Sequence, residues 1–173
     1  MVSVLKPKSG VVIQPARRFD PTDLVEHHDL SQPAVPGQPA TLRLRPGDFR
    51  LALTHEEVIL PPSLAGNIQG RSSLARAGLA VHITAPHINP AWSGRITLEL
   101  YNHGPWELEL FPGEDRVSQL ILYRVTSRVS KAVADALSTY VRQATAFPPR
   151  TPERPLPPPT GSAVRRPPPR RPR

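Results

Sequence analysis

Apolar and polar residues alternate over short segments through the middle of the chain. Residues 41–45 alternate, a Pro-Gly-Asp turn signal follows at residues 46–48, and residues 49–54 alternate again. A period of two places the apolar side chains of a strand on one face, so this pattern predicts a β-hairpin.

Further short apolar segments follow at close spacing, separated by turn signals such as Pro61-Pro62 and Pro112-Gly113. Each is a predicted strand: residues 57–60, 64–69, 79–84, 95–101, 106–110 and 116–125. Many short strands in succession are typical of an all-β sandwich or barrel rather than of alternating strands and helices. One helical turn is expected among them, at residues 72–77.

The two ends of the chain carry different patterns. Residues 1–39 are rich in proline and charge and only weakly periodic, whereas apolar residues recur at helix-compatible spacing over residues 131–146. The pattern therefore predicts four parts: an extended Pro-rich leader at 1–39, a β-barrel core at 40–127, a helix or lid segment at 128–147, and a disordered Pro/Arg-rich tail at 148–173.

The positive charge is concentrated at the C-terminal end. Residues 148–173 contain seven arginines and one glutamate, so they hold +6 of the formal net charge of +8. The remaining 147 residues carry only +2, so the folded body gives no electrostatic reason to bind nucleic acid. Only the basic tail has a composition suited to an acidic surface or nucleic acid, and we expect it to be solvated.

Composition also excludes several classes of protein. The chain has no cysteine, so disulfides and thiolate metal sites are excluded. No apolar run suits a signal peptide or reaches the about 18 residues of a membrane helix. We therefore expect a soluble, cytoplasmic protein with no membrane partner.

Residues 70–79, the cradle, carry the strongest chemical signal. Their sequence, Gly-Arg-Ser-Ser-Leu-Ala-Arg-Ala-Gly-Leu, combines two hydroxyls, two guanidiniums and flanking glycines. Glycine lets the backbone approach closely, and hydroxyls and guanidiniums donate hydrogen bonds to anionic oxygens, so the cradle can wrap a phosphate. A strand carrying Glu99 follows, with Leu98 and Leu100 on its other face. Alternation alone fits a solvent-facing carboxylate at Glu99; beside the cradle it indicates a nucleotide site with an acid/base.

The order of these motifs resembles the dCTP deaminase family within the dUTPase-like superfamily, from about residue 14 to residue 125 and again near residue 138. The matching motifs lie at residues 46–49, 59–66, 70–79, 81–85, 94–100, 112–113 and 118–120. The resemblance implies a distorted jelly-roll β-barrel of the dUTPase-like type. It also implies a homotrimer with active sites shared between neighbouring subunits.

Three departures from the family pattern stand out. Asn89-Pro90-Ala91 occupies the place of an Asp-Pro-Gly. The N-terminal part lacks an element that relatives use for an early strand and for nucleotide contacts. The C-terminal lid, Lys-Tyr-x-x-Gln-x-Gly in the family, is reduced to Tyr140 and Gln143.

The resemblance implies hydrolysis of dCTP to dUTP and ammonia without a catalytic metal. Water is a poor nucleophile and an amino group a poor leaving group, so one carboxylate takes the proton from water and passes it to the base nitrogen. That role falls to Glu99, while Ser72 and Arg76 position the water and stabilise the charge developing on it. Zinc deaminases use a different, cysteine-containing pattern. Mg²⁺ is expected only as a partner of the triphosphate.

The nucleotide contacts that the resemblance implies come from both motifs, the closing strand and the lid: Arg71, Ser72, Ser73, Leu74, Ala75, Arg76, Ala85, Asn89, Thr97, Leu98, Glu99, Gln119, Tyr140 and Gln143. The residues alone leave other interpretations open. These are Arg71 as a surface charge, Ser73 as a helix N-cap, Arg76 as an ion-pair partner of Glu99, Asn89 as a turn residue, and Tyr140 on a plain amphipathic helix.

Two other functions are weighed. The first is a dUTP pyrophosphatase, or a bifunctional deaminase and pyrophosphatase; it is disfavoured because the neutral amide of Asn89 cannot take a proton from water. The second is a non-catalytic relative that binds nucleotides or proteins, which the shortened N-terminal part and the reduced lid favour.

Overall fold

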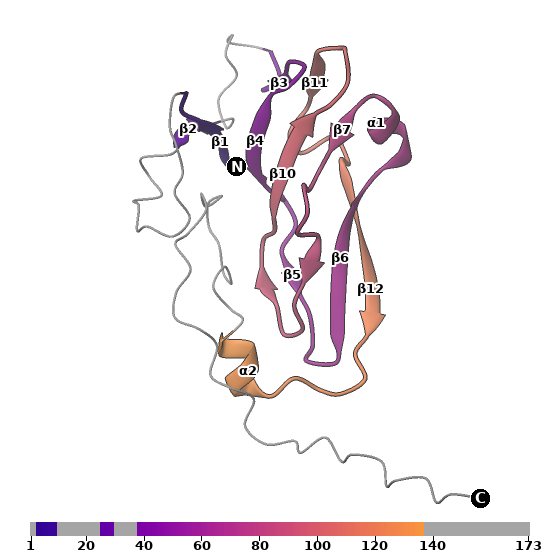
Figure 1. Cartoon of the computed structure of the whole chain (residues 1–173). Coiled ribbons are helices and arrows are strands. Elements are labelled where there is room, and N and C mark those ends of the chain that lie inside the picture. The colour runs from indigo at the N-terminus through magenta and orange to yellow at the C-terminus, as the bar shows by residue number, and fades with distance from the viewer. Residues whose placement is uncertain (1–2, 10–24, 30–37, 137–173) are drawn as a thin grey trace, which may run out of the picture.

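The computed structural model describes residues 3–9, 25–29 and 38–136. Within them the chain is built mainly from strands, which confirms the predicted all-β class (Figure 1). The strands are β1 (Ser3–Pro7), β2 (Val25–Asp29), β3 (Leu42–Leu44), β4 (Phe49–Leu53), β5 (Val58–Ile59), β6 (Leu64–Gly70), β7 (Leu79–Ala80), β8 (His87–Ile88), β9 (Ser93–Gly94), β10 (Thr97–Asn102), β11 (Leu108–Leu110) and β12 (Ser118–Arg124); the helices are α1 (Ser72–Arg76) and α2 (Lys131–Ala136).

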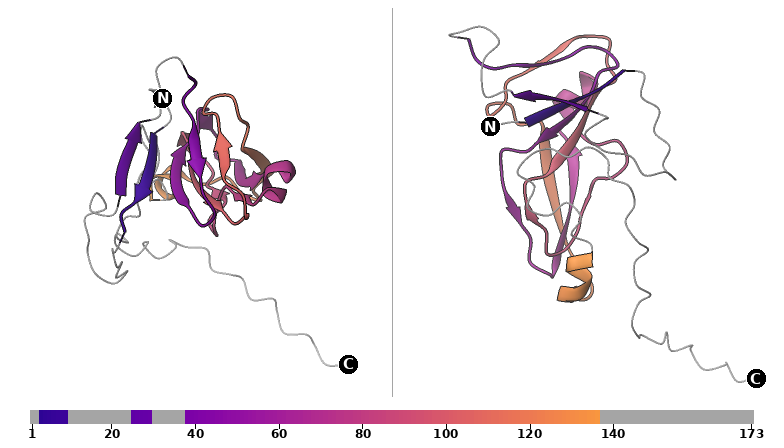
Figure 2. Two further views of the ribbon diagram at one scale, coloured as in Figure 1. Left: turned by 90° about the horizontal axis from the view of Figure 1, so that it is seen from above. Right: turned by 90° about the vertical axis from the view of Figure 1, so that its left-hand side faces the viewer.

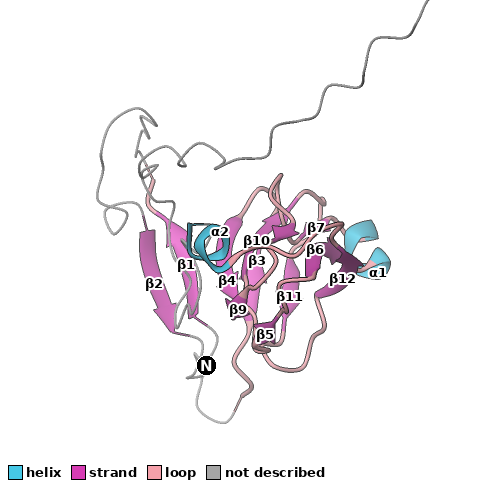
Figure 3. Cartoon of the chain, turned by 90° about the horizontal axis from the view of Figure 1, so that it is seen from below, coloured by secondary structure: helices cyan, strands magenta, loops and turns pink. Residues whose placement is uncertain are grey.

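In this part of the chain the strands form four antiparallel groups rather than one closed barrel. The largest sheet has the order β2-β1-β4-β10-β7, a second has the order β12-β6-β8, and two pairs are β11-β3 and β5-β9. Strands β4 and β10 lie on one side of the interior and β6 and β12 on the other (Figure 3).

One hydrophobic cluster fills the interior between these sheets. Its largest contributions are leucines, and burying a leucine side chain contributes about 1.5–3 kcal/mol to folding. The predicted alternation of β10 is confirmed, because Ile96, Leu98 and Leu100 are at most 4% exposed and Glu99 lies on the other face. Buried members of the cluster come from strands on both sides: Leu42, Leu44, Ala52, Ile68, Leu98, Leu100 and Leu110.

The predicted hairpin at residues 41–54 is wrong. Strand β3 pairs with β11 and strand β4 pairs with β10 and β1, so the two belong to different sheets. The turn between β3 and β4 explains why the chain passes from one sheet to another at this point. The amide of Gly47 donates to the carbonyl of Asn102 at 2.8 Å, which ties the turn to the end of β10 instead of folding β4 back on β3.

Strands β1 and β2 lie in the segment predicted as an extended leader, where the sequence indicated no strand. They pair antiparallel with each other, and β1 joins the main sheet through the pairs Val4–Ala52 and Leu5–Leu51. The pair lies at one edge of the main sheet, beyond β4 (Figure 2, left). An early strand is therefore present, although the sequence pattern suggested that it was lacking.

The two helices are short. Helix α1 falls within the predicted turn at residues 72–77, but Arg71 is its N-cap, so the interpretation of Ser73 as the N-cap is wrong. Helix α2 covers the start of the predicted helix at residues 131–146. The rest of that segment and the predicted disordered tail lie outside the described residues. Among the described residues, neither α1 nor α2 has the length and apolar content of a membrane-spanning helix.

Ala91 is the only non-glycine residue in the described segments with a positive φ, at 62°. The left-handed conformation costs a residue with a Cβ about 1–2 kcal/mol, whereas glycine loses about 0.5–1 kcal/mol through its more flexible unfolded state. We therefore expect Ala91→Gly to raise the free energy of unfolding by about 0.5–1 kcal/mol in urea titrations. The control Ala80→Gly, within β7, should lower it; equal losses in both variants would contradict the assignment of strain to Ala91.

Candidate active site

Helix α1 presents the polar side chains of the cradle to solvent. Leu74 packs against the hydrophobic cluster and anchors the helix. The side chains of Arg71, Ser72, Ser73 and Arg76 are exposed, so their hydroxyl and guanidinium groups are accessible to a ligand. Arg71 makes one further contact, because its Nη1 donates to the carbonyl of Arg116 at 3.4 Å.

The cradle ends in a close backbone contact with the turn between β10 and β11. The amide of His103 donates to the carbonyl of Gly78 at 2.8 Å. Gly78 has a φ of +100°, and a methyl group there would overlap the backbone of Gly104. A methyl group at Gly104 would in turn overlap the carbonyl oxygen of Ala77. Both positions therefore require glycine, and the contact fixes where the cradle sits against β10.

Strand β7 connects the cradle to the strand that carries Glu99. Its two residues pair with Tyr101 and Asn102 of β10. The chain then continues alongside β10, where the amide of Glu99 donates to the carbonyl of Val81 at 3.1 Å. The motif at residues 81–85 thus begins directly beside Glu99.

Glu99 is partly buried and its carboxylate is held in place. Oε2 accepts a hydrogen bond from the amide of Ile83 at 2.8 Å. Leu51 lies directly opposite in the register of β4 and is 7% exposed, so this face of the sheet is not in bulk solvent. Glu99 therefore lies partly buried on the face of β10 opposite the core leucines, with one carboxylate oxygen bonded to the amide of Ile83. No local sequence pattern indicates the contact with Ile83, because it joins residues 16 positions apart in two different segments.

Arg76 and Glu99 are both described, and they do not form the ion pair that the sequence left open. The side chain of Arg76 is exposed.

Gln119 of β12 reaches the start of the cradle, since its Nε2 donates to the carbonyl of Gly70 at 3.2 Å. Asn89 is partly buried and its carbonyl accepts from the amide of Trp92 at 3.2 Å, so its backbone belongs to a turn.

The remaining predicted contacts fall into three groups. Ala75 and Ala85 are exposed, and Thr97 is partly buried at the start of β10. Leu98 is 4% exposed on the face opposite Glu99, so its side chain points into the core and only its backbone is available to a ligand. Tyr140 and Gln143 lie outside the described residues.

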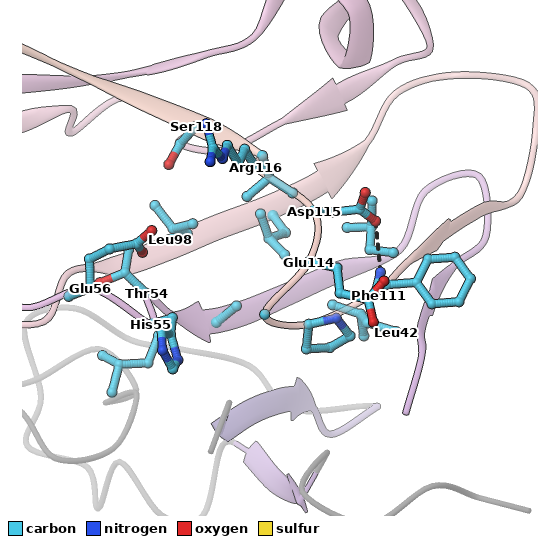
Figure 4. Close-up of a pocket in the computed structure, with 17 residues that line it drawn as sticks. Leu42, Thr54, His55, Glu56, Leu98, Phe111, Glu114, Asp115, Arg116 and Ser118 are labelled. Carbon is cyan, nitrogen blue, oxygen red and sulfur yellow. Dashed lines mark hydrogen bonds between the residues drawn. The ribbon is translucent and has the colours of Figure 1, made fainter. Parts of the chain in front are cut away.

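Two pockets flank this region, and neither contains Glu99 or Ser72. The smaller, of about 330 Å³, lies between α1 and β7 and is lined in part by Gly70, Ala75 and His82. The larger, of about 400 Å³, is lined in part by Leu98 (Figure 4) and by Leu100. Since these side chains alternate with Glu99 along the strand, this pocket lies on the opposite side of β10 from Glu99. Neither of them therefore encloses the cradle and Glu99 together.

Comparison with known proteins agrees with these motifs. A family model described as dCTP deaminase-like matches residues 5–125. The chain belongs to this dCTP deaminase-like family. The match includes the cradle, the segment at residues 81–85 and Glu99, and it covers the described strands from β3 to β12.

The family's named relatives are longer than the part that this chain matches. A dCTP deaminase of Tolumonas auensis is 59% identical over 70 residues, 40% of this chain and 36% of that protein. A dUMP-forming dCTP deaminase of Streptomyces coelicolor is 44% identical over 109 residues, 63% of this chain and 56% of that protein. The chain thus spans about a third to a half of the length of these curated relatives.

A solved structure supports the fold. The 2′-deoxycytidine 5′-triphosphate deaminase of Agrobacterium tumefaciens superposes with a TM-score of 0.61 at 19% sequence identity, covering 75% of this chain and 38% of that one. At this level of identity the likeness concerns the fold alone, and it confirms the expected all-β architecture.

Proposed function

We propose that the chain is a cytoplasmic enzyme of pyrimidine deoxynucleotide metabolism that hydrolyses dCTP to dUTP and ammonia. The observation that carries the proposal is the placement of Glu99: its carboxylate is partly buried, fixed by the amide of Ile83, and joined to the cradle through β7. Membership of the dCTP deaminase-like family and the names of its relatives supply the substrate.

In the proposed reaction Glu99 takes a proton from the attacking water and delivers it to the departing amino group. The hydrogen bond from Ile83 fixes one carboxylate oxygen, so the other oxygen is the one oriented toward the water. Ser72 and Arg76 orient the water and stabilise the charge that develops on it. Arg71, Ser72 and Ser73 hold the triphosphate, whose charge a Mg²⁺ ion would partly neutralise.

The proposed enzyme is a homotrimer whose neighbouring subunits complete each site. Within one chain the polar side chains of α1 face solvent, and the two pockets described leave Glu99 out. The outer face of the β12-β6-β8 sheet supports such a contact, because the register places no Lys, Arg, Asp or Glu on it. The register places these partly or fully exposed residues on it: Asn67, Gln69, His87, Gln119, Ile121 and Tyr123.

Depletion of charge together with exposed apolar and aromatic side chains is typical of the centre of a protein interface. Ile121 is 50% exposed and Tyr123 is 38% exposed. Light scattering should therefore give about three times the 19.0 kDa chain mass. Ile121→Lys should reduce the mass to that of one chain, whereas the control Ile59→Lys, at a site 73% exposed on β5, should leave it unchanged. A wild-type chain that stays monomeric contradicts the shared site.

One observation favours a second product. The Streptomyces coelicolor relative is named as dUMP-forming, and its match is longer than that of the Tolumonas auensis relative. Release of pyrophosphate requires a base for a second water, and the amide of Asn89 cannot accept that proton. Chromatography of the nucleotides formed from dCTP separates the two: dUTP is expected, and dUMP with pyrophosphate would overturn the proposed product.

A further inference from the structure

The larger pocket combines an apolar floor with an acidic rim. Its floor is made of core side chains, among them Leu42, Ala52, Leu98 and Leu100. Glu56 stands on one side, after β4, and Glu114 and Asp115 on the other, in the turn between β11 and β12 (Figure 4). This arrangement suits a ligand that is apolar in part and positively charged in part.

The rim carboxylates are available for a cationic partner. Glu56, Glu114 and Asp115 are exposed, and none of them forms an ion pair with a described residue. By contrast, Glu107 and Glu109 are paired with Arg43 of β3 and with Arg45, which follows this strand. Asp115 is also fixed, because its Oδ2 accepts from the amide of Phe111 at 2.7 Å. Arg116 is the only Lys or Arg among the residues that line this pocket.

The charge of this rim argues against the nucleotide as its occupant. Three carboxylates face one guanidinium, so a triphosphate would meet net repulsion. The pocket also lies across β10 from Glu99, because Leu98 and Leu100 line it. It is therefore separate from the proposed reaction centre.

The chain itself contains a segment of the complementary chemistry. Residues 150–173 hold seven arginines against one glutamate, nine prolines and a leucine at position 156. A guanidinium pairs with a carboxylate through two parallel hydrogen bonds, while arginine methylenes and proline rings cover apolar surface. The 13 residues between Ala136 and residue 150 can span up to about 45 Å when extended, which exceeds twice the about 13 Å radius of gyration of a domain of this size.

We propose that residues 150–173 bind in the larger pocket of their own chain, with arginines paired to Glu56, Glu114 and Asp115 and the apolar groups against the leucine floor. Attachment to the chain gives the segment an effective concentration in the millimolar range, so even a millimolar interaction leaves about half of the molecules bound. The proposal is independent of the deaminase reaction.

The absence of cysteine from the chain makes a direct test possible. Ser162→Cys in the full chain introduces a single thiol between the two arginine groups of the segment, and a nitroxide attached there broadens amide signals that come near it. We expect signals of residues 54–56 and 114–116 to lose about half of their intensity relative to the reduced label. The variant Glu56→Lys/Glu114→Lys should restore them.

The matched control is Glu26→Lys/Glu57→Lys, which makes the same change of charge at exposed positions outside the pocket lining. The control should retain the broadening. The proposal is overturned if broadening is absent, if it persists in Glu56→Lys/Glu114→Lys, or if it concentrates around Glu107 and Glu109. It is also overturned if nitroxide-bearing chains broaden the same signals of a cysteine-free, isotope-labelled chain, because the occupant is then a second copy.

Discussion

Glu99→Gln should lower the rate of ammonia release from dCTP by about 10²- to 10⁴-fold, the usual contribution of a general acid and base. Glutamine has the same shape, and its carbonyl oxygen can still accept the hydrogen bond from Ile83. It cannot take a proton from water. The loss should therefore appear in kcat, measured as ammonia released per enzyme at saturating dCTP.

Binding of dCTP should survive this substitution. A single hydrogen bond contributes about 1 kcal/mol to a free energy, so titration calorimetry should give a Kd within about tenfold of the wild-type value. The control Glu57→Gln, at an exposed position outside the cradle, should leave kcat unchanged. Turnover by Glu99→Gln near the wild-type rate would remove this carboxylate from the reaction.

Of the single methyl groups that could be added to the cradle, the one introduced by Gly78→Ala should lower the free energy of unfolding most. The positive φ of +100° costs a residue with a Cβ about 1–2 kcal/mol. The added methyl group also overlaps the backbone of Gly104, and such overpacking costs about 1–3 kcal/mol more. The expected loss in the free energy of unfolding is therefore about 2–5 kcal/mol, measured by urea titration.

Gly113→Ala separates the two causes of this loss. Gly113 has a φ of +89°, and nothing lies within 4 Å of an added methyl group. Gly113→Ala should therefore lower the free energy of unfolding only by the conformational cost of about 1–2 kcal/mol. Equal losses at both glycines would show that the contact between the cradle and the β10–β11 turn contributes nothing to stability.

The sequence predicted those parts of the molecule that local pattern determines. The alternation of residues 95–101 correctly separates the buried leucines from Glu99, and the single turn of α1 occurs where it was expected. The pairing of β3 and β4 was predicted wrongly, because the alternation on both sides of the Pro-Gly-Asp turn is the same for a hairpin and for a crossing between sheets. Contacts with distant segments distinguish them, such as the hydrogen bond from Gly47 to Asn102 and the pairing of β3 with β11.

The missed features depend on contacts between distant segments. Strands β1 and β2 lie among prolines and gain their place by pairing with each other and with β4. The rim of the larger pocket joins residues 56 and 114, which no local pattern relates. The hydrogen bond from Ile83 to Glu99 likewise arises from the path of the chain after β7. The cradle and Glu99 were identified because a family pattern relates them.

The most direct test of the proposed function is to follow ammonia and nucleotide together while the purified full chain acts on dCTP with Mg²⁺. We predict that the chain releases one ammonia for each dUTP formed, and that Glu99→Gln loses this activity. A correctly folded chain that binds dCTP and releases no ammonia would contradict the proposal that this partly buried carboxylate catalyses deamination.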